Sequence, residues 1–266
     1  MNEHPDFKRR VAVVTGGAMG IGAQVCEALA VAGHQVVVAD LDFEAAAATA
    51  DRLNRVGGQV GGQAGGQAVA LAMDVGRPES ITRAFAQIER DFGRCDILVN
   101  CAGIAKIFSF LDFPLDNFAA TMNVNVTGTL LCAQAAARLM LRSHWGRIVN
   151  IASVAGIRAV GTGRTAYGTS KAAVIALTRQ MAVELAEHGI TANAVAPGPV
   201  DTPMTRALHT DRFREEYAKA IPMNRYGTTA EIAAAVMYLV SDAAAYTSGI
   251  VLPVDGGFLA SGARGL

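Results

Sequence analysis

Short runs of aliphatic and β-branched residues return along this chain at intervals that leave room for a helix between them. The first run, Val11–Val14, leads into a Gly-rich turn and then into an Ala- and Leu-rich stretch, Ile21–Ala32, whose apolar spacing is helical and which ends at Gly33. Further runs stand at Gln35–Ala39, Ala68–Met73, Ile97–Val99, Arg147–Ile151, Thr191–Val195 and Ile250–Val254. Strands without polar alternation require a parallel sheet that helices cover on both faces.

The alternation therefore predicts an α/β fold, a single-domain Rossmann-type doubly wound sandwich in which a seven-stranded parallel sheet is flanked by about six helices. A length of 266 residues fits one large domain spanning 1–266. Hydrophobic residues make up 52% of the chain and charged residues 17%, so the chain can bury a substantial core and wholesale disorder is excluded.

Two segments depart from the alternation. Residues 57–67 hold three tandem Gly-Gly-Gln repeats, which carry too little side chain to bury and predict a flexible surface loop. Residues 197–228 begin with three prolines and are too long for an ordinary connection. Long segments of this kind in compact domains often close over a ligand, so we expect a substrate lid.

Charge and cysteine usage exclude several classes of function. Lys plus Arg and Asp plus Glu both number 23, so nothing marks the chain as a binder of nucleic acid or of an anionic membrane. The four cysteines lack metal-ligand spacing and fit reduced thiols, so we expect no metal site. The N-terminal apolar run is too short for a secretory core and no stretch approaches a membrane span, which predicts a cytoplasmic protein.

The first strand passes into the first helix through Thr15-Gly-Gly-Ala-Met-Gly-Ile-Gly22. Glycines at such a turn let a pyrophosphate approach the amides at the helix N-terminus, where the helix dipole favours negative charge. The place between a strand and a helix is the one that a dinucleotide site requires. A dinucleotide site is therefore predicted, although glycines alone fit a plain tight turn equally well.

Asp40 ends the second predicted strand, eighteen residues after Gly22. A carboxylate there accepts hydrogen bonds from both hydroxyls of an adenosine ribose and repels a 2′-phosphate, and neither Met19 nor Leu41 supplies the cation that a phosphate needs. We therefore expect NAD rather than NADP as the cofactor. The alternative is that Asp40 only caps the helix that begins near Asp42.

Further candidate residues follow the third and fourth strands. Asp74 and Val75 come after the third strand, and Asn100, Ala102 and Gly103 come at or after the end of the fourth. The carboxyl ends of parallel strands form the edge at which ligands bind in open α/β sheets. We therefore expect these residues to line the cofactor site.

Ser153 follows the fifth strand, Tyr167 stands fourteen residues further on, and Lys171 comes four residues after Tyr167. The segment Ala166–Leu185 is predicted to be a helix, so the phenol and the ammonium group share one face. The ammonium group would lower the pKa of the phenol, which could then exchange a proton with a substrate alcohol near neutral pH. The Ser153 hydroxyl can donate a hydrogen bond to the same oxygen. A Tyr/Lys pair alone is commonly exposed helix surface, so the prediction rests on the combination.

Taken in this order, these residues resemble the short-chain dehydrogenase/reductase family over nearly the whole chain, from Arg10 to Gly257. The landmarks are the turn 15–22, Asp74, Asn100–Gly103 with Cys101 where the family usually has a second Asn, Asn125, Ser153, Tyr167, Lys171, Pro197-Gly198 and Asp255-Gly256-Gly257. The resemblance implies hydride transfer between a nicotinamide and a carbonyl carbon, with Tyr167 giving or taking the proton.

The resemblance also implies roles for individual residues. Asn125 would hold a water that links Lys171 to solvent, although from the residues alone Asn125 could equally bend a helix, and Asn123 is as good a choice. Lys171 would also bind the nicotinamide ribose, and residues 197–202 would line the nicotinamide. The expected cofactor residues are then Gly16, Met19, Gly20, Ile21, Gly22, Asp40, Leu41, Asp74, Val75, Asn100, Ala102, Gly103, Tyr167, Lys171, Pro197, Gly198, Val200 and Thr202.

The substrate pocket is expected to combine residues after Ser153, the loop after Gly103 and the lid. Its walls would be apolar, which suits a secondary alcohol, a polyol or cyclic alcohol, or the matching ketone, of modest size. The wall residues are Ile104, Phe108, Val154, Ile157, Val160, Met204 and Leu208. Charged side chains beside a cleft are more often solvated surface, so none of the nearby basic residues is assigned to an anionic group; these are Lys106, Arg158, Arg164 and His209.

Two other functions remain open. One is a reductase of 3-oxoacyl thioesters of acyl carrier protein, which on this scaffold normally takes NADPH, against the implication of Asp40. The other is a non-catalytic dinucleotide-binding regulator, which would not need Tyr167 or Lys171. The family resemblance also implies a homotetramer, and the C-terminal Phe258-Leu-Ala fits either a subunit contact or the chain's own core.

Overall fold

The computed structural model describes residues 9–57 and 67–261. Within them the strands form one parallel seven-stranded sheet in the order β3-β2-β1-β4-β5-β6-β7. The strands are β1 (Val11–Thr15), β2 (Gln35–Asp40), β3 (Ala68–Ala72), β4 (Ile97–Asn100), β5 (Gly146–Ile151), β6 (Ile190–Pro197) and β7 (Val251–Val254). Each coincides with a predicted run to within two residues, and the predicted fold class is confirmed. The predicted Gly-rich loop, 57–67, lies almost wholly outside the described residues.

Nine α-helices occur in the described part of the chain, more than the six or so predicted. They are α1 (Gly20–Val31), α2 (Phe43–Gly57), α3 (Pro78–Phe92), α4 (Leu115–Met122), α5 (Gly128–Met140), α6 (Thr165–Leu185), α7 (Pro203–Leu208), α8 (Asp211–Ala220) and α9 (Thr229–Val240). The excess has two causes. The predicted lid itself folds into α7 and α8, and a π-helical turn, Asn123–Thr127, separates α4 from α5.

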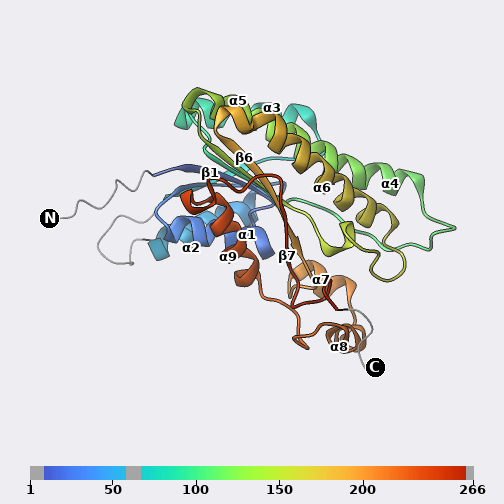
Figure 1. The fold of residues 1–266 in the computed structure, drawn as a ribbon. Coiled ribbons are helices and arrows are strands. Elements are labelled where there is room, and N and C mark those ends of the chain that lie inside the picture. The colour runs from blue at the N-terminus through green and yellow to red at the C-terminus, as the bar shows by residue number, and fades with distance from the viewer. Residues whose placement is uncertain (1–8, 58–66, 262–266) are drawn as a thin grey trace.

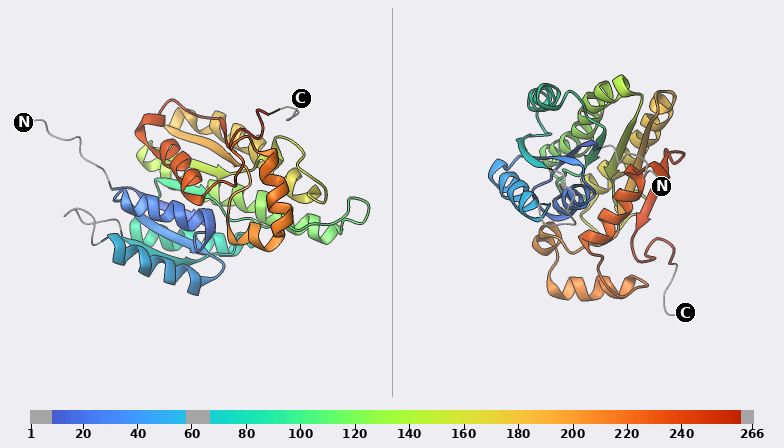
Figure 2. Two further views of the ribbon diagram at one scale, coloured as in Figure 1. Left: turned by 90° about the horizontal axis from the view of Figure 1, so that it is seen from below. Right: turned by 90° about the vertical axis from the view of Figure 1, so that its left-hand side faces the viewer.

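Helices cover both faces of the sheet, because alternate residues of a strand point to opposite sides. Ala12 and Val14 of β1 pack in one core cluster with α1, α2 and α9, whereas Val11 and Val13 pack in another with α3, α5 and α6. Figure 1 shows the two helical layers on opposite sides of the strands, and Figure 2 shows them from two further directions. Both faces of β1 are thus buried, which is why its sequence has no polar alternation.

One helical run in the described residues, Leu115–Ser143, is long and apolar enough to cross a membrane. Half of its most apolar stretch is buried inside the protein, where Cys132, Ala136 and Met140 pack in the core beside α3. The run is therefore a core helix of this fold. The cytoplasmic location stays a prediction.

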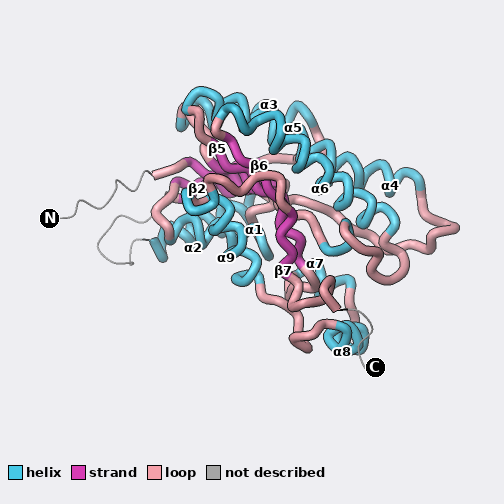
Figure 3. The backbone as a smooth tube through the Cα atoms, in the orientation of Figure 1, coloured by secondary structure: helices cyan, strands magenta, loops and turns pink. Residues whose placement is uncertain are grey.

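The chain reverses its direction across the sheet at β1. Strands β2 and β3 are added on one side of β1, and β4 to β7 on the other. Ligands in open α/β sheets bind at such a switch point, outside the carboxyl ends of the strands. Long connections gather near α4, α7 and α8 in Figure 3, beyond the strand ends. The topology therefore places the candidate site at this end of the sheet.

The segment 197–228 is anchored at its base. Val200 pairs with Gly227, and the Asp201 amide donates to the Gly227 carbonyl at 3.0 Å. Arg206 and Arg214 both bind the Asp201 carboxylate, at 2.8 and 2.9 Å, and lower its pKa to about 2. Whether the segment opens and closes as a lid stays a prediction.

The C-terminal Phe258 packs inside its own chain. It is buried in one cluster with Val154 and Ile221, beside the partly buried Tyr217 and Tyr226. The sequence fitted Phe258 either to a subunit contact or to the chain's own core, and the structure supports the core. The homotetramer stays a prediction.

The close packing at the start of α1 predicts that a single methyl group added at Gly22 destabilises the protein. A Cβ at Gly22 would lie 2.0 Å from the Gly16 carbonyl oxygen, a backbone atom that cannot move without displacing the whole turn. We expect Gly22→Ala to lower the free energy of unfolding by about 1–3 kcal/mol or more, measured by chemical denaturation. Gly93→Ala is the control for backbone strain alone, because it adds a methyl group in open space at a left-handed position, which costs about 1–2 kcal/mol without any clash. Equal stability of Gly22→Ala and the unchanged chain would contradict this account.

Candidate active site

A cavity of about 570 Å³ lies at the carboxyl edge of the sheet, lined by residues that end or follow strands β1 to β6. The structure brings to it all the expected cofactor residues except two. The lining members are Gly16, Met19, Gly20, Ile21, Asp40, Leu41, Asp74, Val75, Ala102, Gly103, Tyr167, Lys171, Pro197, Gly198, Val200 and Thr202. Gly22 and Asn100 do not line it. Gly22 packs behind the turn, and Asn100 is buried in the sheet, where its amide donates to Asn150 at 2.9 Å.

The Gly-rich turn is built to receive an anion. A Cβ at Gly16 would lie 2.8 Å from Ala102 Cα, so only glycine allows this turn to pack against the end of β4. Thr15 Oγ1 fastens the two segments by accepting hydrogen bonds from the Cys101 and Ala102 amides. The N-cap residue of α1 is Met19, which supplies no side-chain cap, and the first turn of α1 holds no acidic residue. The glycine backbone and the dipole at the N-terminus of α1 fit the pyrophosphate of a dinucleotide.

The Asp40 carboxylate lies at the cavity wall and braces the Gly-rich turn. It accepts hydrogen bonds from the Ala18 amide at 3.0 Å and from the Asp42 amide at 3.1 Å. The helix α2 is capped by a different residue, since the Asp42 carboxylate accepts from the Ala45 amide at 3.0 Å. The alternative that Asp40 only caps this helix is therefore wrong. A carboxylate offers about four acceptor positions, so Asp40 retains capacity for a ligand.

Ser153, Tyr167 and Lys171 meet in the same cavity. Ser153 begins a short 3₁₀ turn after β5, and its hydroxyl accepts a hydrogen bond from the Ala155 amide and shares another with the Tyr167 phenol. Lys171 lies one turn after Tyr167 on α6, with its Nζ atom 5.7 Å from the centre of the phenol ring. That Nζ donates to the Ile151 carbonyl at 2.7 Å. The predicted grouping of these three side chains is present.

Burial shifts the pKa of Lys171 and that of Tyr167 in the directions that favour their neutral forms. It lowers the pKa of the buried Lys171 to about 8. It also raises the pKa of Tyr167, against the smaller opposing effects of the Ser153 hydrogen bond and the Arg164 charge. The expectation that the Tyr167 pKa is lowered is therefore wrong: burial raises it, and Lys171 is not among the groups that shift it. The Tyr167 phenol keeps its proton at neutral pH.

Asn125 lies buried in the π-helical turn, and its side chain holds neighbouring segments. The amide nitrogen donates to the Ile104 carbonyl at 3.0 Å and to Ser170 Oγ at 2.9 Å, and the amide oxygen accepts from the Ile104 amide at 2.8 Å. Asn123 instead is exposed and donates to the Gly76 carbonyl. Of the two asparagines, Asn125 is thus the one that faces the active-site helix α6. A water between Asn125 and Lys171 stays a prediction.

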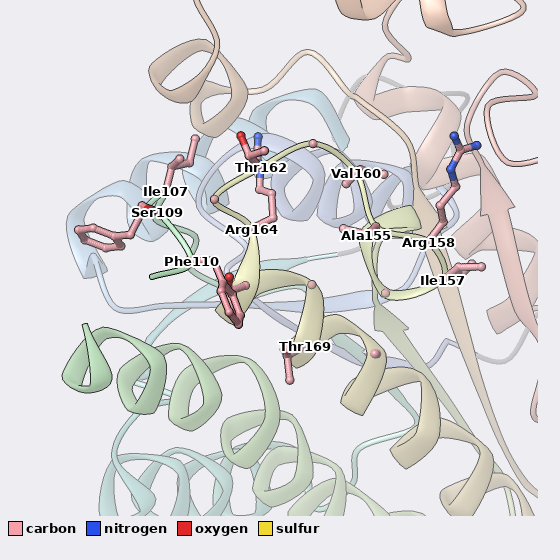
Figure 4. A pocket seen from close by; sticks show the side chains of 18 residues that line it. Ile107, Ser109, Phe110, Ala155, Ile157, Arg158, Val160, Thr162, Arg164 and Thr169 are labelled. Carbon is pink, nitrogen blue, oxygen red and sulfur yellow. The ribbon is translucent and has the colours of Figure 1, made fainter. Parts of the chain in front are cut away.

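The expected apolar walls are only partly present. Ile104 and Met204 line the cavity with Tyr167, whereas Phe108, Ile157 and Val160 line a neighbouring cavity of about 920 Å³. Figure 4 shows this second cavity, between the loop after Gly103 and the loop that leads into α6. Val154 is wrong as a wall residue because it is buried beneath Phe258 and Ile221, and Leu208 lines neither cavity.

Several lining residues were not predicted. They are Met73, Cys101, Val124, Ile151, Ala152, Pro203 and Thr205. The strand-end rule that found Ser153 would also have found Ile151 and Ala152, but Val124 reaches the cavity only through the π-helical turn. Burial raises the pKa of the Cys101 thiol to about 11, so it is not a ready nucleophile. Within residues 9–57 and 67–261, no three His, Cys, Asp or Glu side chains gather closely enough to hold a metal ion.

Comparisons with known proteins agree with this arrangement. A family model described as enoyl-(acyl carrier protein) reductase matches residues 16–259. The chain is 38% identical over 249 residues to the 3-oxoacyl-[acyl-carrier-protein] reductase FabG of Aquifex aeolicus, covering 93% of this chain and 96% of that one.

Solved structures give the same result. A short-chain type dehydrogenase/reductase from Mycobacterium marinum superposes with a TM-score of 0.89 at 36% identity, over 96% of this chain and 98% of that one. A gluconate 5-dehydrogenase from Burkholderia cenocepacia, in complex with NADP and tartrate, has a TM-score of 0.87 at 33% identity, over 95% and 96% of the two chains. The chain therefore belongs to the short-chain dehydrogenase/reductase family and is an oxidoreductase of CH–OH and C=O groups.

Proposed function

We propose that this chain interconverts a ketone and a secondary alcohol with NAD(H), and that Tyr167 exchanges the proton. The observation that carries the proposal is the meeting of Ser153, Tyr167 and Lys171 in the cavity that the Gly-rich turn also lines. A bound nicotinamide dinucleotide supplies or accepts the hydride. The protein's own task is to hold the carbonyl oxygen and to move one proton at it.

Each of the three side chains has a distinct task. The Ser153 hydroxyl donates a hydrogen bond to the substrate oxygen, where negative charge develops. The Tyr167 phenol gives that oxygen its proton, and its raised pKa keeps it in the protonated form that reduction of the ketone requires. Lys171 is oriented by the Ile151 carbonyl and would hold the nicotinamide ribose. Asn125 would hold the water that returns a proton toward Lys171.

Asp40 supports NAD over NADP as the cofactor. Its carboxylate stands at the wall of the cavity, where a 2′-phosphate would meet like charge. Lys171 is the only cation among the described residues that line the cavity, and it lies at the catalytic end. The family as such takes a nicotinamide dinucleotide of either kind, and the relative from Burkholderia cenocepacia was solved with NADP.

A 3-oxoacyl thioester is the second candidate substrate, and the comparisons favour it over a free secondary alcohol. FabG of Aquifex aeolicus and MabA of Mycobacterium tuberculosis, both 38% identical to this chain, are named as 3-oxoacyl-[acyl-carrier-protein] reductases. Such a thioester presents the same ketone to Tyr167, so the proposed chemistry is unchanged. A regulator without catalysis has less support, since such a protein has no need of the three grouped side chains.

Replacing the proton donor tests the proposed reaction. We expect Tyr167→Phe to lower kcat by about 10²- to 10⁴-fold, because it removes the general acid. Turnover is measured by the absorbance of NADH with cyclic and linear ketones and with a 3-oxoacyl thioester of N-acetylcysteamine, and NADH binding by fluorescence. Tyr217→Phe is the matched control, because Tyr217 is a second tyrosine with a raised pKa that does not line the cavity. Near-normal turnover by Tyr167→Phe with NADH still bound would overturn the proposal.

The lowered pKa of Lys171 predicts a pH dependence. Below about pH 8 the ammonium form dominates, and above it the charge is lost. We therefore expect kcat/KM for NADH in ketone reduction to fall by about tenfold per pH unit above pH 8, since this parameter reports groups of the free enzyme. Lys171→Arg keeps its charge and should lack this fall. A profile that is flat from pH 6 to 10 would argue against the role of Lys171.

Removing the Asp40 charge tests the cofactor. We expect the unchanged chain to prefer NADH. Asp40→Asn should lower the ratio of kcat/KM with NADH to kcat/KM with NADPH by about tenfold or more, because losing about 1.4 kcal/mol of repulsion between Asp40 and the 2′-phosphate corresponds to a factor of ten. Asp42→Asn removes an equal charge two residues away without touching the cavity and should leave the ratio unchanged. A preference of the unchanged chain for NADPH would refute the assignment of NAD.

A further inference from the structure

Two arginines line the 920 Å³ cavity beside the catalytic cavity, and no acidic side chain does. Figure 4 shows Arg158 and Arg164 at opposite ends of the loop that leads into α6. Elsewhere Arg206, Arg214 and Arg225 each bind a carboxylate. Within the described residues Arg158 and Arg164 have no such partner, so this cavity carries an uncompensated positive charge.

Arg164 is the one of the two that belongs to the catalytic helix. It directly precedes α6, and the Gly168 amide donates to its carbonyl at 2.7 Å, so it forms part of the first turn. It is the N-cap residue of α6, three residues before Tyr167, and it lines the 920 Å³ cavity whereas Tyr167 lines the neighbouring catalytic cavity. The two residues are close enough for the guanidinium charge to favour the phenolate. Arg164 is half-buried rather than solvated, unlike the exposed Arg158.

The lid holds the Arg164 side chain in place. Its Nη2 atom lies 2.7 Å from His209 Nε2, and His209 Nδ1 lies 3.0 Å from the Tyr226 hydroxyl. Arginine can only donate, so His209 accepts at Nε2 and carries its proton on Nδ1. Burial and the charges of Arg164 and Arg214 lower the pKa of His209, which keeps it neutral at pH 7. The neutral imidazole orients the guanidinium without cancelling its charge.

We propose that Arg164 binds a carboxylate of the substrate, so that the compound reduced beside Tyr167 is an oxo acid and its product a hydroxy acid. The assignment rests on the proposed function, since it concerns the substrate of that same site. A guanidinium has five N–H donors in a planar fork, and His209 uses one of them. The remaining donors match the two oxygens of a carboxylate.

A single carboxylate fits this site better than the other acceptors. A phosphate dianion would call for a second cation, and Arg158 stacks on Phe258, 5.2 Å from its ring, at the other end of the loop. A neutral thioester offers a carbonyl oxygen but no charge to compensate the half-buried guanidinium. A free oxo acid is therefore a better match for Arg164 than its thioester or ester.

The test compares acids with their methyl esters in the complete enzyme with NADH. The substrates are 3-oxobutanoate, 4-oxopentanoate and 5-oxohexanoate, which vary the distance from ketone to carboxylate. For at least one pair we expect kcat/KM of the acid to exceed that of the ester by about 10- to 100-fold, as one charge-assisted contact allows. Arg164→Gln should reduce this ratio to about one, and Arg158→Gln, which removes an equal charge from the same cavity, should preserve it.

The outcomes separate this inference from the proposed function. Turnover of esters or of the uncharged ketone panel without a preference for any acid would overturn the carboxylate assignment and leave the proposed reaction standing. Equal losses on acid and ester in Arg164→Gln would show a structural role instead and likewise overturn it. No turnover of any ketone, charged or uncharged, would overturn both. Loss of the acid preference in both arginine variants would show a general charge effect and would also refute Arg164 as the specific contact.

Discussion

The hydrogen bond from the Lys171 ammonium group to the Ile151 carbonyl fixes the active-site helix against the end of β5. A buried ammonium needs a hydrogen-bond partner, and the carbonyl of Ile151, the last residue of β5, supplies one. This contact sets the position of α6, and with it that of Tyr167 one turn earlier. Ser153 follows Ile151 by two residues, so the same strand end positions both partners of the substrate oxygen.

Desolvation governs the chemistry of this arrangement more than the pairing of opposite charges does. The pKa of Lys171 falls to about 8 while that of Tyr167 rises, so burial brings both groups closer to their neutral forms. The phenol is therefore protonated at neutral pH, which is the form that a proton donor in ketone reduction requires. The Ser153 hydrogen bond and the Arg164 charge oppose the rise.

The segment 197–228 influences the site through charge as well as shape. His209, at the end of α7, contacts Arg164 at the start of α6, and Tyr226 contacts His209 from the return of the segment to the core. Phe213 and Tyr217 of α8 pack on the same imidazole. Any movement of these helices would therefore change the environment of Arg164 and, through it, that of Tyr167.

The sequence by itself determined the sheet, the Gly-rich turn and the order of the catalytic residues. Apolar strands, helical spacing and glycines at a tight turn act over a few residues, so Val11–Val14 or Gly16–Gly22 can be interpreted where they stand. Only the tertiary structure decided that Asp42 rather than Asp40 caps α2, that Val154 is buried, that Tyr167 holds its proton, and that Arg164 meets His209 across 45 residues. Each of these depends on burial and on contacts between segments distant in the chain, and no local pattern carries that information.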